Sequence, residues 1–342
     1  MDLSGQFSTI FEQLINGVTV GSFYALVALG YTMVYGVLSM INFAHGDIFM
    51  VGAYFGFFTI QRLSQAGLMQ SNPVLSIALT FLAGSLGAAL TGFLVERIAY
   101  RPLRKATRLA TLISAIGASI FLQELVRLIP TIGSSLLNLR LSGNYLFSEA
   151  TRQGTLKLIM DMGGAAVKTY PGILTSDGFT LAGVFITYSR VLIIGLSLLI
   201  MVLLNLLVRY SKLGKAMRAV AEDKDTAALM GINVNRIISQ TFLIGSALAG
   251  LAGVMVGMFY LQIKPTMGFV PGIKAFTSAV LGGIGNIPGA MLGGYMLGLA
   301  EVVAVQFLPA VYKDIVAFAM LILVLILKPT GLLGSSVGQK RA

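Results

Sequence analysis

Ionisable side chains inside apolar stretches are the residues of this sequence best placed to do chemistry. They are His45 and Asp47 in one stretch, Glu124 and Arg127 in a second, and Glu301 in a third. A charge at the centre of a bilayer costs about 2.5–3.5 kcal/mol on insertion scales, so each of these groups needs protein, a counter-charge or water beside it. Carboxylates and an imidazole in such surroundings can hold a proton, bind a cation or line a polar path.

The spacing offers a structural alternative for two of these sites. Arg127 follows Glu124 by three residues, one helical turn, and this favours a local ion pair over catalysis. Glu301 has no basic residue close to it in the sequence. It must therefore either line a path or bond to a neighbouring helix.

Two interruptions of apolar sequence predict broken helices. Polar residues enter an apolar run between Asn42 and Asp47, where capping of the broken helix is the structural alternative. The turn 282–289 is rich in glycine, which tolerates positive φ, and its Pro288 has no amide hydrogen. Transporters place substrate sites at such discontinuities. The candidate path or gate residues are therefore Asn42, His45, Asp47, Gly283, Gly285, Asn286 and Glu301.

The composition indicates a membrane protein. Of 342 residues, 56% are hydrophobic and only 11% are charged, whereas soluble domains carry about 25% charged residues. The chain contains no Cys and one His. This excludes a disulfide framework, a thiol nucleophile and a Cys- or His-cluster metal site.

The apolar runs predict an all-α, polytopic transmembrane helix bundle that forms a single transmembrane domain over 1–342. A crossing helix needs about 20 mostly apolar residues. We expect about eight or nine membrane segments, including broken or re-entrant elements, and whether 272–282 crosses fully stays open. Glycines at four-residue spacing, such as Gly17 with Gly21 and Gly294 with Gly298, predict close helix packing. The expected spans are 13–36, 41–60, 74–95, 109–129, 191–208, 237–260, 289–307 and 314–328.

The basic residues predict the orientation. More than half of the 24 Lys and Arg residues lie in 96–108, 209–236 and the tail after 327. The positive-inside rule assigns all three regions to the cytoplasm. The N-terminus and a partly ordered loop, 130–190, are then external, and the C-terminus is cytoplasmic. The net charge of +11 follows from this orientation and is no sign of nucleic-acid binding.

The cytoplasmic loop 209–236 predicts a coupling element. Residues 214–230 are rich in alanine and typical of a helix, and Gly231 suits its C-terminal cap. Such a narrow amphipathic helix can enter a groove on another protein, and the alternative is a helix on the membrane surface. The chain has no Gly-x-x-x-x-Gly-Lys-Ser/Thr loop, so we expect no ATP hydrolysis by the chain itself and no enzyme activity.

Four motifs in order resemble the permease subunit of branched-chain amino acid importers of the ATP-binding cassette class. They are Ile-Asn-Phe-Ala-His-Gly-Asp at 41–47, the loop 214–233, the glycine-rich run 279–290 and Lys-Pro-Thr-Gly-Leu at 328–332. The resemblance covers nearly the whole chain except about 140–175. It implies a bacterial inner-membrane protein that works with a second permease, two ATPase subunits and an external substrate-binding protein.

By this resemblance, the loop 214–233 docks on an ATPase. ATP and Mg are then used by the partners, and this chain binds no cofactor. The loop residues expected to couple are Gly214, Met217, Arg218, Ala221, Glu222, Asp223 and Gly231.

Other functions stay open from sequence. Similar permeases serve urea and short amides. A self-contained ion-coupled carrier would use Asp47 or Glu301 as its proton or sodium site, and a membrane scaffold would have no path of its own.

Overall fold

The computed structural model is an α-helical bundle with a few short strands. It describes residues 3–104, 106–137, 140–141, 144–145, 163–172, 177–181 and 183–334. The helices are α1 (Leu3–Leu38), α2 (His45–Gln65), α3 (Leu68–Ser71), α4 (Pro73–Val95), the π-helical η1 (Glu96–Tyr100), the 3-10 turn η2 (Arg101–Leu103), α5 (Arg108–Leu137), α7 (Tyr188–Tyr210), α8 (Lys212–Glu222), α9 (Lys224–Leu229), α10 (Val234–Tyr260), α11 (Phe269–Gly282), α12 (Ile287–Phe307), η3 (Ala310–Tyr312) and α13 (Lys313–Leu327). The strands are β1 (Arg140–Leu141), β2 (Asn144–Tyr145), β3 (Lys168–Thr169), β4 (Gly178–Leu181), β5 (Val184–Thr187) and β6 (Gln262–Ile263).

The buried centre consists of α1, α2, α10, α11 and α12. Helix α1 packs most extensively on α12 and α10, and α10 packs on α4 and α2. Small residues permit this close approach: a Cβ added at Gly21 of α1 would lie 2.8 Å from the Cα of Tyr295 in α12. The predicted close packing at glycines is therefore confirmed for α1 against α12.

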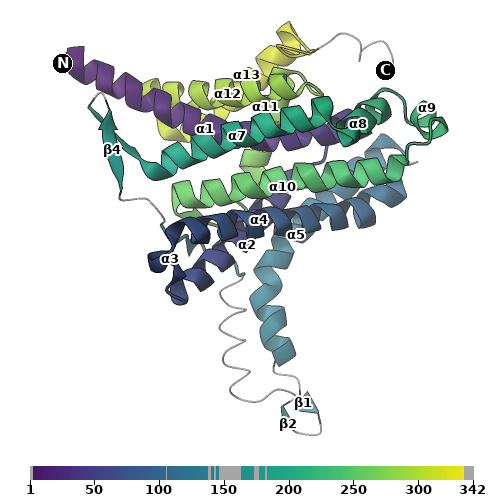
Figure 1. The fold of residues 1–342 in the computed structure, drawn as a ribbon, viewed down its shortest axis with the longest axis horizontal. Helices are drawn as coiled ribbons and strands as arrows, with labels where there is room; N and C mark the ends of the chain where they lie inside the picture. Colours follow the sequence, from purple (N-terminus) through teal and green to yellow (C-terminus); the bar gives the residue numbers. More distant parts are fainter. Residues whose placement is uncertain are drawn as a thin grey trace.

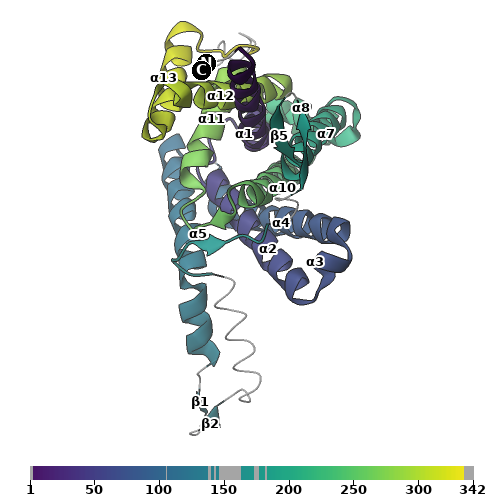
Figure 2. The same cartoon turned by 90° about the vertical axis from the view of Figure 1, so that its left-hand side faces the viewer.

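Two outer helices, α5 and α7, are largely exposed on the surface of the bundle. In the described chain, six helices are long and apolar enough to span a membrane, and α5 and α7 are the least buried of them. Helix α5 runs along one side of the bundle and continues beyond it toward β1 and β2 (Figure 2). The prediction of an all-α polytopic bundle is confirmed.

A proline lets α5 bond to a distant segment. Pro130 lies inside α5 and has no amide hydrogen, so the carbonyl of Val126 lacks its helical donor. The backbone amide of Gly164 donates to that carbonyl at 2.9 Å. The following residues reach the bundle, where Tyr170 is buried and β3 pairs with β6. Residues 163–170 thereby join α5 to the end of α10.

Both predicted breaks are present. Helix α1 ends at Leu38, Ser39 has a positive φ of 59°, and α2 begins at His45. Ala44 is the N-cap of α2 and makes no side-chain capping bond. At the second break, α11 ends at Gly282 and α12 begins at Ile287. Helix α11 has 14 residues, about 21 Å at 1.5 Å per residue. Helix α11 is therefore too short to cross the bilayer by itself.

Two loop predictions need correction. The loop expected at 130–190 begins later, because α5 remains helical to Leu137. Its later part contains the antiparallel hairpin β4–β5.

The single helix expected at 214–230 is two helices, α8 and α9. Asp223 ends the first, and its Oδ1 accepts from the amides of Asp225 and Thr226, both at 2.9 Å.

The basic segments gather at one end of the bundle, here named the α8–α9 end (Figure 1). Lys224 Nζ donates to the carbonyl of Leu38, the last residue of α1, at 3.3 Å. Arg104, after η2, donates to Asn235 at the start of α10. A Cβ at Gly36 would lie 3.9 Å from the Cα of Gly285, which places the turn after α11 at this end too. The bundle therefore groups the basic segments as one orientation requires.

Candidate functional site

The break before α2 forms a buried polar cluster. Asn42 Oδ1 accepts from the hydroxyl of Tyr100 at 2.6 Å. His45 is fully buried and packs edge-to-face on Tyr31, with ring centroids 4.6 Å apart. Neither ring nitrogen has a partner of ordinary hydrogen-bond geometry within the described chain. A Cβ at Gly30 would lie 2.7 Å from His45 Cε1, so the ring fills its space completely.

Asp47 ties α2 to α5. Its carboxylate is 1% exposed and accepts hydrogen bonds from Ser119 Oγ and, at 2.9 Å, from Gln123 Nε2. These bonds are to side chains of another helix, so the interpretation of Asp47 as a cap of α2 is wrong. In the described chain, α5 packs mainly on α2 and η1. It is therefore loosely attached, and the Asp47 carboxylate helps to hold it.

Glu301 lies in an ion-pair network among four helices. Lys274 Nζ of α11 is 2.9 Å from Glu301 Oε1 and 2.6 Å from Asp314 Oδ1 of α13. The hydroxyl of Tyr24 in α1 donates to Glu301 Oε2 at 2.9 Å, and Lys313 Nζ lies 3.5 Å from the same oxygen. Glu301 is fully buried. Of the two roles left open from sequence, the structure supports bonding to neighbouring helices.

The glycine-rich turn docks on the C-terminal segment. Asn286 accepts from the amide of Gly289 as N-cap of α12, and its Nδ2 donates to the carbonyl of Leu333 at 2.7 Å. The amides of Leu332 and Leu333 donate to the carbonyls of Leu281 and Gly282 at 2.8 and 3.0 Å. Positive φ values of 105° at Gly283 and 93° at Gly285 shape the turn. Two motifs far apart in sequence thus form one structure.

The candidate path residues fall into two places. The break at 42–47 and the turn at 283–286 approach each other, and side chains close the narrow space between them, leaving no room for a water molecule. Those side chains are Tyr31, Tyr35, Ile41, Phe276, Ala279 and Ile284. Glu301 lies elsewhere, in the network with Lys274. No set of three or more metal-ligating side chains occurs among the described residues.

The loop at the α8–α9 end presents two distinct faces. Gly214, Met217 and Val220 of α8 are buried against the bundle. Arg218, Ala221, Glu222 and Asp223 lie on the exposed side. Gly231, just after α9, has a positive φ of 82°, as expected of a residue that ends a helix. The predicted amphipathic loop is confirmed as a structure.

Lys224 fastens this loop to the bundle. The Lys224 ammonium is partly buried and donates to the carbonyl of Leu38. Burial, together with the nearby Arg104 guanidinium, lowers the pKa of Lys224, and Asp225 opposes this shift. Arg104 in turn pairs with the buried Glu96, which also accepts from Ser239 Oγ at 2.7 Å.

Comparison with known proteins decides the family. Residues 13–325 match the family described as branched-chain amino acid transport system, permease component. The chain belongs to this family. The permease protein BraD of the high-affinity branched-chain amino acid transport system of Pseudomonas aeruginosa is 47% identical, over 96% of this chain and 97% of that protein. LivH of Salmonella typhimurium is 44% identical over 99% and 100%. The probable LivH of Methanocaldococcus jannaschii is 27% identical over 94% and 92%.

Sequence reasoning missed several residues that support the permease site. Lys274 lies in the short apolar run 272–282 and was not recognised as the partner of Glu301. A lysine within an apolar run, followed by an apolar run whose acid has no basic neighbour in sequence, is a signal for an ion pair between the two helices. Glu96 begins the basic segment 96–108 that the sequence places in the cytoplasm, and the structure buries it fully. Ser119, Gln123 and Tyr100 have no sequence signal, because their roles depend on which helices become neighbours.

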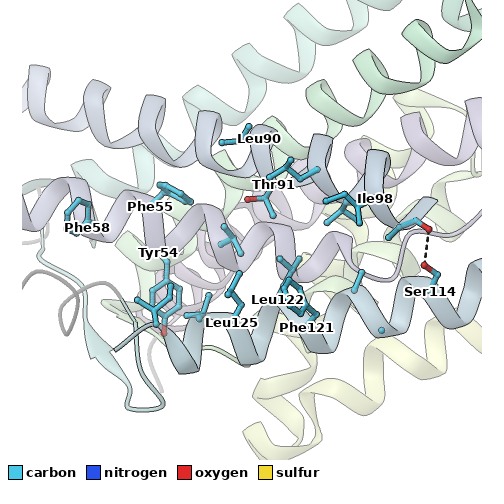
Figure 3. Close-up of a pocket in the computed structure, with 18 residues that line it drawn as sticks. Tyr54, Phe55, Phe58, Leu90, Thr91, Ile98, Ser114, Phe121, Leu122 and Leu125 are labelled. Atoms are coloured by element: carbon cyan, nitrogen blue, oxygen red, sulfur yellow. Dashed lines mark hydrogen bonds between the residues drawn. The ribbon is translucent and has the colours of Figure 1, made fainter. Parts of the chain in front are cut away.

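The permease also contains a large apolar cleft between α2, α4 and α5 (Figure 3). Its volume is about 760 Å³, and 18 residues line it. The only side-chain polar atoms on its wall are the hydroxyls of Tyr54, Thr91 and Ser114. A zwitterion needs partners for both charges, and burial without them is costly. The cleft is therefore unsuited to bind a free amino acid.

Proposed function

We propose that the permease is the membrane subunit of an ATP-binding cassette importer that moves branched-chain amino acids across the bacterial inner membrane. It works with a second permease, two ATPase subunits and an external substrate-binding protein. ATP and Mg are used by the ATPases. The family match and the relatives named for branched-chain amino acid transport support the substrate class.

The two-faced loop at the α8–α9 end carries this proposal. Met217 and Val220 on its apolar face pack against the bundle of this chain. Arg218 and Ala221 on the opposite face are exposed. Lys224 donates to the carbonyl of the last residue of α1. A displacement of the loop would therefore be transmitted directly to this central helix. Force from ATPase closure then enters at α8–α9 and shifts α1 against α2.

The path itself is proposed to pass the break before α2. Asn42, His45 and Asp47 lie there, and Asp47 joins the loosely packed α5 through Gln123. Separation of α1 from α11 would open the narrow space, because Tyr31 and Tyr35 of α1 and Phe276 and Ala279 of α11 line it. The turn at Gly283, Gly285 and Asn286 would act as a gate that moves with the C-terminal segment, and Glu301 would hold the helices around the path.

The orientation follows from the same grouping. The basic segments lie at the α8–α9 end, and the positive-inside rule places them in the cytoplasm. Helix α1 then begins outside, and η3, α13 and the segment after α13 together return the chain to the cytoplasmic side.

Single-cysteine crosslinking tests the docking face, because the chain has no cysteine of its own. Ala221→Cys, on the exposed face, should crosslink to an ATPase subunit in the assembled complex. Val220→Cys is the matched control, since the adjacent side chain is buried in the bundle. Reconstituted vesicles should take up leucine only with ATP and both ATPases present. Uptake by the permease alone, driven by a proton or sodium gradient, would establish the carrier alternative instead.

A further inference from the structure

The apolar cleft between α2, α4 and α5 has the dimensions of a lipid-chain site. Its wall on α5 runs from Ser114 to Ile129, about 22 Å at 1.5 Å per residue. One leaflet contributes about 15 Å to a hydrocarbon core of about 30 Å. The cleft is therefore long enough to follow an acyl chain through one leaflet. Figure 3 shows its two ends, with Phe58 and Tyr54 at one and Ile98 and Ser114 at the other.

The chemistry of the wall suits hydrocarbon. Thr91 Oγ1 donates to the carbonyl of Gly87 at 2.8 Å, and Ser114 Oγ donates to the carbonyl of Ala99 at 2.9 Å. Both hydroxyls therefore already donate to backbone carbonyls of this chain. The Tyr54 hydroxyl is buried and lacks a hydrogen-bond partner in the described chain. Apart from this one group, the wall requires nothing polar from an occupant.

The cleft opens on the outside of the bundle. Leu90 is 57% exposed, Ile98 72% and Phe121 63%, and all three line it. A Cβ at Gly117 would meet no atom within 4 Å, so the middle of α5 leaves the cleft wide. The mouth is therefore open on the surface of this chain.

One end of the cleft is basic. The α4–η1 lining row of Leu90, Leu94 and Ile98 leads directly to Arg97 and Arg101, both exposed. Among the described residues, neither arginine makes an ion pair, and the acid of this segment, Glu96, is taken by Arg104. Two arginines beside the end of an apolar groove are complementary to an anionic headgroup.

We propose that this cleft binds an anionic phospholipid, with one acyl chain between α4 and α5 and the phosphate at Arg97 and Arg101. The charges favour a lipid over a helix of another protein, because a purely apolar helix would leave both arginines without a counter-charge. The site shares α5 with the proposed path, but it uses neither the break before α2 nor the α8–α9 loop, so lipid binding is measured without transport.

Bromine quenching of a single tryptophan tests the site, because the full-length chain contains no Trp. Phe121→Trp places a reporter in the cleft, and Leu199→Trp on α7 is the control at an exposed position away from it. Each variant is reconstituted in vesicles that contain brominated phosphatidylglycerol or brominated phosphatidylcholine at equal mole fraction. For each reporter we compare quenching by brominated phosphatidylglycerol with quenching by brominated phosphatidylcholine. We expect this ratio to be at least about fivefold higher for the cleft reporter than for the control reporter.

Two further variants separate the headgroup from the chain. Arg97→Gln with Arg101→Gln, in the Phe121→Trp background, should remove the preference while quenching by phosphatidylcholine remains, which also shows that α5 is still in the bilayer. Gly117→Leu should fill the cleft and lower quenching by both lipids. Equal quenching by the two lipids would reduce the cleft to ordinary bilayer contact, and an unquenched reporter would mean that protein covers it. Either result overturns the proposal, as does a preference that survives loss of both arginines.

Discussion

Lys274 Nζ lies 2.9 Å from Glu301 Oε1 inside the bundle, and both side chains are almost completely buried. This pair joins α11 to α12, and the Tyr24 hydroxyl extends it to α1. Because a buried charge without a partner is expensive, the pair commits the three helices to one arrangement.

Removing one member of this pair should destabilise the permease strongly. Lys274→Met leaves Glu301 buried beside only its weaker contacts, and we expect a loss of about 3 kcal/mol in the free energy of unfolding. The double variant Lys274→Met, Glu301→Leu should lose less than the single one, because no charge remains buried. Unfolding in detergent, followed by circular dichroism, measures both.

The half-exposed pair Glu124–Arg127 is the control for that experiment. Arg127→Met should cost less than Lys274→Met, because Glu124 is half-exposed and is not enclosed by neighbouring helices as Glu301 is. A double variant at 274 and 301 that is as unstable as the single one would show that packing, not charge, dominates there.

The bonds from α5 to Asp47 should govern the mobility of α5. Gln123→Ala removes a donor to a buried carboxylate, so we expect faster amide hydrogen exchange along α5 and slower transport. Ser134→Ala, an exposed hydroxyl on the same helix, should change neither. Unchanged exchange in the Gln123 variant would mean that Ser119 alone holds Asp47.

The part of the C-terminal segment up to Gly334 should stabilise α11. A chain that stops after Leu327 loses the amides of Leu332 and Leu333, which satisfy the carbonyls of Leu281 and Gly282. We expect a loss of about 1 kcal/mol for each bond, seen as a lower Tm. A chain that stops after Gly334 keeps both bonds and should match the full-length protein. If the two truncations melt alike, the docked segment does not stabilise α11.

Glycines should differ according to what a methyl group would meet. A Cβ at Gly250 of α10 would lie 2.5 Å from the Cβ of Ala88, so Gly250→Ala should cost about 1–3 kcal/mol through overpacking. Gly195 in α7 has open space around it. Gly195→Ala should therefore be neutral or stabilise by up to about 1 kcal/mol. Parallel thermal melts compare them, and equal effects would contradict the close packing of α10 on α4.

Local features of the fold followed from the sequence because they depend on neighbours in the chain. The length of the apolar runs predicted the six helices of the described chain that are long and apolar enough to span a membrane, but the spans expected at 41–60 and 314–328 are not among those six. The polar residues at 42–47 predicted the break before α2. The split of α8 from α9 was missed, since the capping bonds of Asp223 compete locally with a continuous alanine-rich helix.

The sequence by itself determined that this protein is a membrane bundle with two broken helices and an amphipathic loop, because hydrophobic length and helical periodicity are properties of short segments. Only the tertiary structure decided that Lys274 pairs with Glu301, that Gln123 holds Asp47 and that Asn286 bonds to Leu333. These partners lie far apart in the chain, and their meeting depends on which helix faces pack together.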